Sequence, residues 1–308
     1  MHTTAAHHTV HPLLAAGPYV TDGGLETDLL FHQGVDLPEF ASFPLVGDAA
    51  GRALLHAYYD DYAAIARSAG QGLLLETPTW RANPDWAARC GYDAAALDRA
   101  NREAVALMRD VEQRSSVEHT LVVGIHGPRG DGYVAGDRPD PDEAADYHGV
   151  QARSLADAGV DLLHAMTITT PEEAVGVVRA ARSVDCPVAV SFTVETDGRL
   201  PDGTTLAAAI QQVDADAAPD WFAVNCAHPT HVAPAFDGGD WQARIAGVRP
   251  NASTLTHAEL DAMEELDEGD LRLLTSSFDG LRSHLPGLAI VGGCCGTDAR
   301  HVAALWGV

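Results

Sequence analysis

Short apolar runs alternate with amphipathic segments along most of this 308-residue chain, and this alternation limits the possible folds more than any other feature. Apolar runs of a few residues, bounded by turn residues, are typical of buried strands in parallel sheets. We predict eight such strands, near Tyr19–Thr21, Gly72–Leu75, Thr120–Ile125, Asp161–Ala165, Pro187–Phe192, Trp221–Asn225, Arg244–Val248 and Leu288–Val291.

Amphipathic helical patterns lie between these runs. The clearest extend over Gly51–Ala69, Asp93–Arg114, Asp142–Ala158, Pro171–Ser183, Thr204–Asp216 and Asp270–His284. Pro171, followed by two glutamates, favours a helix start, because proline fits the first turn and negative charge stabilises that end. Gly70 and Gly159 follow helical patterns at the place where a left-handed residue commonly ends a helix.

Strands that alternate with helices pair in parallel. Eight strand–helix units over about 250 residues are typical of a (β/α)8 barrel. We therefore predict a single barrel domain over residues 1–308, with residues 1–12 as a disordered N-terminal tail. A doubly wound sheet is the alternative fold, but the glycine-rich segment Asp22–Glu26 lacks the glycine spacing that such a sheet uses after its first strand.

The charge balance bears on partners and location. The chain has 44 acidic and 19 basic residues, which gives a net charge of −25. Such a surface repels phosphate backbones and anionic lipids, so we expect neither nucleic acid nor membrane partners. No apolar run approaches the roughly 18 residues of a membrane span, and the N-terminus lacks the pattern of a signal peptide. We expect a cytoplasmic protein that acts on small molecules, and no pattern indicates its oligomeric state.

Three of the five cysteines form the strongest chemical signal. Cys294 and Cys295 are adjacent and lie between glycines in Gly292–Gly296, and Cys226 ends another apolar run. Three thiolates that converge from two strand ends make a zinc site with one open position, which is the arrangement of a catalytic metal. A buried cysteine pair without metal and a vicinal disulfide are the alternatives. The other two cysteines fit buried structural thiols.

Polar residues recur at the ends of other predicted strands. They are Asp22, Glu76, His126 and Asn225. The C-terminal ends of the strands carry the active site in a (β/α)8 barrel, so the fold is expected to gather these side chains around the cysteines.

The segment Gly292–Gly296, together with Val224-Asn225-Cys226, resembles the signature of the cobalamin-independent homocysteine S-methyltransferases. The resemblance covers nearly the whole chain. Asp22–Thr27 is similar to the family's first-strand motif, Ser191-Phe192 with Asp202–Thr204 is similar to its fifth unit, and Arg249–Ala252 stands where the family usually has Tyr-Pro-Asn. It implies a zinc-dependent barrel that moves a methyl group from a sulfonium or ammonium donor to a thiol.

The resemblance also implies residue roles. The three cysteines hold zinc and take part in catalysis, Asp22 binds the amino group of homocysteine, and the backbone N–H groups of Gly23 and Gly24 bind its carboxylate. We place Asn225 among the substrate-binding residues as well. The family's fourth strand usually ends in Glu-Thr, and that Glu also binds the amino group. Met166 occupies its place here, and a thioether accepts hydrogen bonds only weakly.

Other positions leave two readings open. Glu76 either replaces the missing Glu at the amino group or pairs with Arg81 or another nearby arginine. His126 either meets the substrate, as a general base or a hydrogen-bond donor, or is a structural histidine. Arg249 and Arg81 either clamp an acceptor carboxylate or pair with acidic groups at the barrel rim. The polar loop from Gly127 to Pro141 is a candidate lid.

We predict a zinc-dependent methyltransferase that moves a methyl group from S-adenosylmethionine or S-methylmethionine to homocysteine and so serves methionine biosynthesis. A betaine donor is less favoured, because the chain ends soon after the cysteine pair. Because Met166 replaces the amine-binding Glu, methylation of another thiol, a selenol or a zinc-bound carbonyl compound is the second hypothesis. A zinc-binding or redox-sensing protein without turnover is the third.

Overall fold

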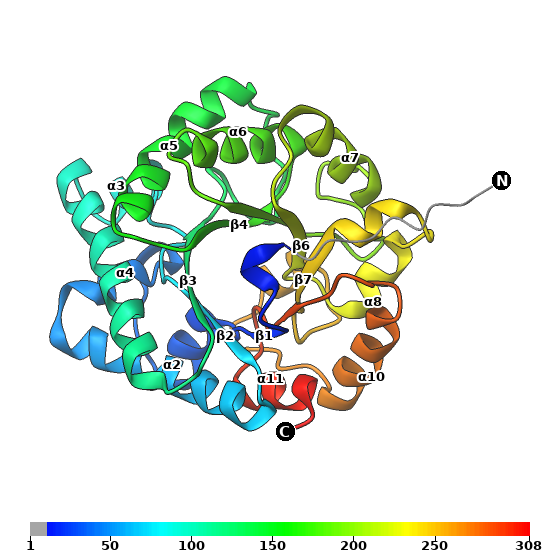
Figure 1. Ribbon diagram of the computed structural model, residues 1–308, viewed down its shortest axis with the longest axis horizontal. Helices are drawn as coiled ribbons and strands as arrows, with labels where there is room; N and C mark the ends of the chain where they lie inside the picture. Colours follow the sequence, from blue (N-terminus) through cyan, green and yellow to red (C-terminus); the bar gives the residue numbers. More distant parts are fainter. Residues whose placement is uncertain (1–10) are drawn as a thin grey trace.

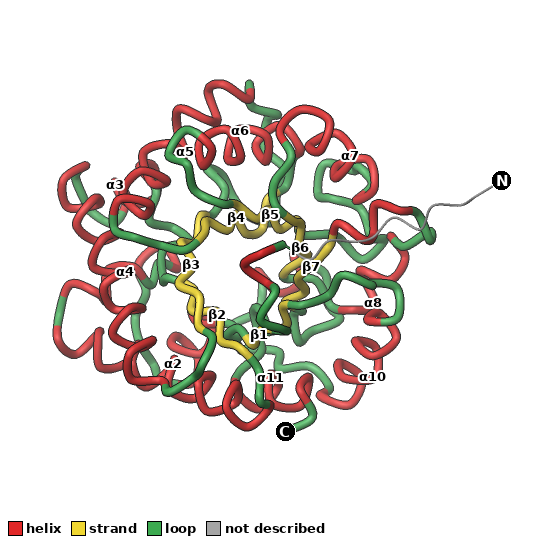
Figure 2. The backbone as a smooth tube through the Cα atoms, viewed as in Figure 1, coloured by secondary structure: helices red, strands yellow, loops and turns green. Residues whose placement is uncertain are grey.

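Eight parallel strands form a closed barrel in the computed structural model, which describes residues 11–308 (Figures 1 and 2). Each strand pairs with its neighbours in chain order, and the first strand also pairs with the last. The predicted (β/α)8 barrel is confirmed. The strands are β1 (Tyr19–Val20), β2 (Gly72–Glu76), β3 (Thr120–His126), β4 (Leu162–Ile168), β5 (Val188–Phe192), β6 (Trp221–Asn225), β7 (Ile245–Arg249) and β8 (Ile290–Val291).

Helices surround the barrel, as Figure 2 shows in red. The outer ring is formed by α2 (Ala49–Ala69), α4 (Ala94–Ser115), α5 (Pro141–Asp157), α6 (Pro171–Arg182), α7 (Leu206–Ala217), α10 (Leu271–Arg282) and α11 (Ala299–Trp306). Between β6 and β7 the helices are all short, and the first of them is α8 (Pro229–Val232). Further short helices lie in the loops: α1 (Leu25–Thr27), α3 (Pro84–Arg89), α9 (His257–Asp261) and η1 to η6 (Pro12–Leu14, Asp28–His32, Pro38–Phe40, Phe43–Gly47, Ala233–Ala235, Asp240–Arg244).

The long helices begin and end where the sequence carries capping residues. Asp48 and Asp93 accept backbone N–H groups at the starts of α2 and α4, and Thr170 does so at the start of α6. Each such cap stabilises a helix by about 1 kcal/mol. Gly70 ends α2 with φ +64°, as its place in the sequence predicts.

The apolar core has two layers. One lies between the strands and the outer helices, and the other fills the inside of the barrel with Leu74, Ile125, Leu162, Trp221 and Ile290. The N-terminal segment crosses the middle of the barrel in Figure 1, and Leu14 of η1 joins the inner layer. Residues 1–10 of the predicted tail lie outside the described residues. Of its last two residues, His11 caps η1 and Pro12 begins it.

Strand alternation places His126 away from the barrel axis. Ile125 belongs to the inner layer, and neighbouring residues of a strand point to opposite faces. His126 therefore points outward to α5, where its ring centre lies 6.3 Å from that of His148. Burial, together with His148, lowers the pKa of His126 to about 3. Neither of its ring nitrogens has a hydrogen-bond partner among the described residues.

No helix within residues 11–308 combines the length and apolar character needed to cross a bilayer.

The buried histidine makes the fold sensitive to acid. The unfolded chain binds a proton at this residue near pH 6.5, whereas the folded protein does so only near pH 3. The free energy of unfolding should therefore fall as the pH drops below 6.5, and His126 alone should account for about 2 kcal/mol of that loss at pH 5. Denaturant titrations between pH 7 and 5 measure the slope.

His126→Gln should make the decline with pH shallower than in the wild type. His119 is exposed, so His119→Gln serves as the control and should leave the slope unchanged. Equal slopes in all three proteins would show that His126 is not the proton-linked group.

Candidate active site

The three predicted cysteines meet at the C-terminal end of the barrel. Cys226 directly follows β6, and Cys294 and Cys295 lie in the loop after β8. Their sulfur atoms all lie within 4.8 Å of one another, although the chain positions are far apart. Hydrogen bonds from Cys226 and Cys295 hold the pKa of Cys294 well below its usual range, which favours its thiolate form. A partly buried sulfur of this kind beside two further thiols is a donor set for a soft cation.

The backbone is strained where it presents these sulfurs. Cys226 has φ +57° and Thr167, at the end of β4, has φ +60°. Positive φ is costly for a β-branched residue such as Thr167. The amide of Asn225 holds this turn, because its oxygen accepts the N–H of Thr167 at 2.8 Å and its nitrogen donates to the Thr167 hydroxyl at 2.8 Å. The Asn225 nitrogen also lies 3.7 Å from the sulfur of Cys294.

The loop after β1 packs directly on the cysteine loop. The N–H of Gly293 donates to the carbonyl of Asp22 at 2.7 Å, and the N–H of Gly24 donates to the carbonyl of Thr297 at 3.0 Å. A Cβ atom on Gly24 would lie 2.6 Å from the carbonyl oxygen of Cys294. Glycine is needed there because the two backbones approach so closely.

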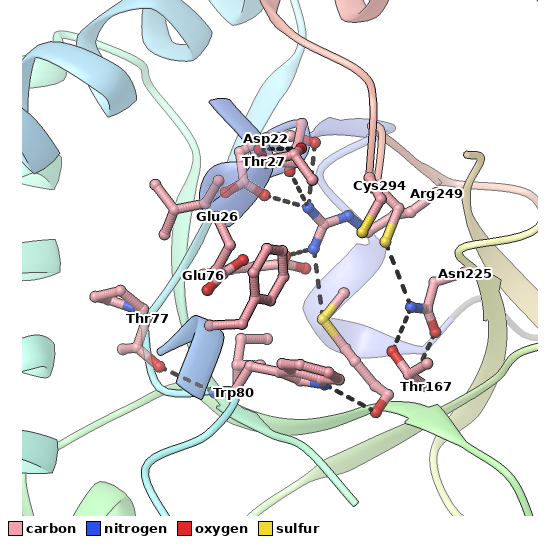
Figure 3. A pocket seen from close by; sticks show the side chains of 18 of the residues that line it. Asp22, Glu26, Thr27, Glu76, Thr77, Trp80, Thr167, Asn225, Arg249 and Cys294 are labelled. Atoms are coloured by element: carbon pink, nitrogen blue, oxygen red, sulfur yellow. Dashed lines mark hydrogen bonds and ion pairs between the residues drawn. The ribbon is translucent and has the colours of Figure 1, made fainter. Parts of the chain in front are cut away.

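A buried arginine occupies the space between these loops and the barrel interior (Figure 3). The guanidinium of Arg249 forms ion pairs with Asp22, at 2.5 Å, and with Glu76. It also donates to the carbonyls of Gly293 at 2.8 Å and Gly23 at 3.0 Å. Burial acts to lower the pKa of Arg249, but the negative groups around it, Asp22 foremost, together outweigh burial and raise the pKa, so the guanidinium stays charged.

The second oxygen of Glu76 has no hydrogen-bond partner among the described residues. The Nδ1 atom of His164 lies 3.6 Å from this oxygen. Burial lowers the pKa of His164 to about 4, so this ring is neutral near pH 7. The positive partner of Glu76 is therefore Arg249. Of the two predicted roles of Glu76, the structure shows the one in which it pairs with an arginine. The partner is Arg249, since Arg81 instead stacks on Trp86 at 3.6 Å.

An inner cavity of about 70 Å3 lies between the charged groups and the cysteines. Of the residues predicted to bind substrate, those that line it are Asp22, Gly23, Gly24, Glu76, Met166 and Asn225. His126 is the exception, because Ile125 takes the inward position on β3 and lines the cavity in its place. The Met166 sulfur lies 3.5 Å from Arg249, so the two residues that depart from the family pattern are in contact.

Tyr133 is a site residue that the sequence analysis missed. It belongs to the loop between β3 and α5, which was considered only as a candidate lid. Its hydroxyl lies 3.1 Å from the sulfur of Cys226 and 3.5 Å from that of Cys295, and its ring centre lies 4.5 Å from the ring of His257. The sequence feature that could have indicated this role is a single tyrosine in a loop otherwise rich in Gly, Pro and Asp.

A second, outer cavity of about 310 Å3 lies beyond Tyr133. It shares Trp80, Phe40, Tyr133 and Cys295 with the inner cavity. Its wall also carries four carboxylates and one guanidinium, from Asp131, Asp261, Glu265, Asp267 and Arg81. The outer cavity therefore combines aromatic rings with an excess of negative charge.

A sequence profile of the homocysteine S-methyltransferases matches residues 19–307, which is nearly the whole chain. The chain belongs to the homocysteine S-methyltransferase family. The protein is accordingly a methyltransferase, and the sequence motifs that resembled this family are part of the matched region. No curated protein sequence matches the chain.

Three crystal structures of the homocysteine methyltransferase MmuM from Escherichia coli are similar to the methyltransferase described here. The oxidised form is 21% identical, with 96% of this chain and 99% of that chain covered and a TM-score of 0.75. The metallated form is 21% identical, with 95% and 96% covered and a TM-score of 0.71. The apo form is 20% identical, with 96% of each chain covered and a TM-score of 0.63. At this identity the likeness shows a shared barrel fold.

The cysteine cluster fits a zinc ion. It supplies three sulfur ligands, which zinc binds readily, and it leaves one position for a further ligand. The amides of Asn225 and Asn251 lie 3.7 Å and 3.8 Å from the sulfurs of Cys294 and Cys226 and can orient those sulfurs. Cys226, Cys294 and Cys295 are therefore the residues that would hold the metal.

We expect one zinc ion per chain in protein purified under reducing conditions. Cys226→Ser, Cys294→Ser and Cys295→Ser should each lower the zinc content to well below half, because oxygen replaces a thiolate ligand. Inductively coupled plasma mass spectrometry measures zinc per chain. Cys90→Ser is the matched control and should retain the metal, since Cys90 lies at the end of α3. Full zinc content in all three cluster variants would rule out this site.

Proposed function

We propose that this methyltransferase transfers a methyl group from a sulfonium donor to a thiol acceptor at a zinc ion held by Cys226, Cys294 and Cys295. The convergence of the three sulfurs beside a polar cavity carries this proposal. The family is named for homocysteine, so homocysteine is the first acceptor to test and methionine the expected product.

Zinc bound at the cysteines would lower the pKa of an acceptor thiol and favour its thiolate near neutral pH. The residues of the chain then orient the acceptor. Asn225 fixes the turn that presents Cys226, and the inner cavity limits where the acceptor chain can lie. Holding two reactants in the correct alignment supplies a large part of the rate in a reaction of this kind.

The transfer balances without a general acid. A lone pair of the acceptor sulfur forms the new bond to the methyl carbon, while the bond from that carbon to the donor sulfur breaks. The bonding electrons stay on the donor sulfur, which leaves as a neutral thioether. The acceptor proton passes to water before transfer, and the leaving group departs uncharged, so no protonated side chain has to assist it.

The outer cavity supports a cationic donor. Carboxylates such as Asp131 and Asp267 attract a sulfonium, and the faces of Phe40 and Trp80 favour a cation over a neutral group. The cavity reaches Cys295, so a donor bound there would lie next to an acceptor at the cysteine cluster. This charge pattern fits S-adenosylmethionine or S-methylmethionine.

Tyr133 bears on access to the cluster. Its hydroxyl lies against two of the three sulfurs and between the two cavities. An acceptor sulfur that reaches the cluster must move this hydroxyl aside, and with it part of the loop. Arg138 ties the same loop to Asp202 at 2.7 Å, at the surface. The loop thus acts as a lid in this proposal.

We further propose that the reaction takes place in the cytoplasm. Two adjacent cysteines and a third nearby would oxidise readily outside a reducing compartment, and the resulting disulfide would remove metal ligands.

The direct test supplies zinc-loaded protein with a donor that carries a deuterated methyl group and with homocysteine. Mass spectrometry of the product should show deuterated methionine for at least one sulfonium donor. Cys294→Ser should reduce the rate by about a thousandfold or more, since a ligand of the reacting centre is lost. Cys90→Ser should retain the wild-type rate. Zinc binding with no methylation of any thiol would instead favour a zinc-binding or redox-sensing protein.

A further inference from the structure

The acceptor end of the inner cavity contains a closed charge cluster of Asp22, Glu76 and Arg249. Their side chains are 6%, 3% and 6% exposed. Charges so deeply buried are stable only when they are paired. The positive charge that pairs with both carboxylates here belongs to the protein itself.

The guanidinium has no N–H donor left for a ligand. Its Nε–H donates to the carbonyl of Gly293, its Nη1 group meets Glu76 and the sulfur of Met166, and its Nη2 group meets Asp22 and the carbonyl of Gly23. An arginine offers five N–H donors, and these contacts use all of them. Arg249 therefore pairs with both carboxylates of the cavity wall and does not clamp an acceptor carboxylate.

The same guanidinium fills the place that a substrate ammonium would need. It touches Asp22 and Met166, the two positions at which an amino group would be bound by analogy with the family pattern. An acceptor ammonium could reach Asp22 only by displacing Arg249 from a buried ion pair. A second cation would also lie close to the guanidinium in a medium of low dielectric constant, where like charges repel strongly.

Met166 fits this arrangement. A glutamate at position 166 would add a third buried carboxylate beside one guanidinium, whereas the neutral thioether lies against it at 3.5 Å. One acceptor stays open, because Glu76 Oε1 is buried, has no hydrogen-bond partner among the described residues and belongs to a residue that lines the cavity. A neutral donor such as a hydroxyl satisfies that oxygen without adding a cation.

We propose that the preferred acceptor is a small thiol whose end remote from the sulfur carries a neutral hydrogen-bond donor, such as a hydroxyl, in place of an ammonium. This proposal rests on the proposed thiol methylation and specifies its acceptor. Arg249 disfavours the ammonium, Met166 makes room for the guanidinium, and Glu76 Oε1 receives the neutral donor.

Two matched acceptors test the proposal. Homocysteine and 2-hydroxy-4-mercaptobutanoate differ only in the ammonium or hydroxyl on the second carbon. The wild-type zinc enzyme should bind the hydroxy thiol about tenfold more tightly, a difference of 1.4 kcal/mol, and methylate it with a correspondingly higher kcat/KM. Isothermal titration calorimetry gives the binding ratio independently of turnover, and mass spectrometry of the methylated products gives the kinetic ratio.

Arg249→Met should reverse the preference, because Asp22 and Glu76 then face the cavity without a resident cation. Arg249→Lys retains the charge and should keep the preference for the hydroxy thiol, so it remains informative if the methionine variant does not fold. Arg244→Met is the matched control. It lies just before the same strand, its partner is Asp214 at 2.8 Å, and it should leave the ratio unchanged.

Tighter binding and faster methylation of homocysteine by the wild type would overturn the proposal while leaving thiol methylation intact. An unchanged acceptor ratio in a folded Arg249→Met protein would also overturn it. If neither thiol binds or is methylated, the proposed function itself fails, and the acceptor proposal fails with it.

Discussion

The pairing of the first strand with the last holds the active site together. The N–H of Thr21 donates to the carbonyl of Val291 at 3.1 Å, and just beyond the two strands the N–H of Gly293 donates to the carbonyl of Asp22 at 2.7 Å. This closure places the segment after β1 beside the segment after β8, although almost the whole chain lies between them. The carboxylate of Asp22 lies near the two adjacent cysteines because the barrel is closed and its strands are parallel.

Local strain accompanies this closure. Thr167 and Cys226 both adopt positive φ, which costs roughly 1–3 kcal/mol for each such residue, and Asn225 bridges them. Because the amide of Asn225 bonds to Thr167 on one side and approaches Cys294 on the other, it links the ends of β4, β6 and β8. The packed barrel beneath supplies the rigidity that keeps the strained turns in place.

Periodicity and motifs predicted the barrel, its strands and the cysteine cluster, because these depend on local sequence and on one topological rule. What they could not predict is which groups touch. His126 was counted among the site residues because it ends an apolar run, yet a strand alternates its faces, and Ile125 already points inward. The partner of Glu76 was open because Arg81 is close in sequence, whereas Arg249 is close only after the barrel closes. Tyr133 was missed because loop conformation, not pattern, brings it to the sulfurs.

The distribution of charge over the two cavities bears on how firmly the reactants and products of the proposed transfer are held. The outer cavity is acidic, which suits the proposed cationic donor, whereas Arg249 pairs with both carboxylates of the inner cavity, which ends at three sulfurs that fit a soft metal. In the proposed transfer a sulfonium and a thiolate are both converted into neutral thioethers. The acidic wall of the outer cavity therefore holds the neutral thioether of the demethylated donor less firmly than the sulfonium of the donor itself. The charge that attracts the donor thus also favours the release of the demethylated donor.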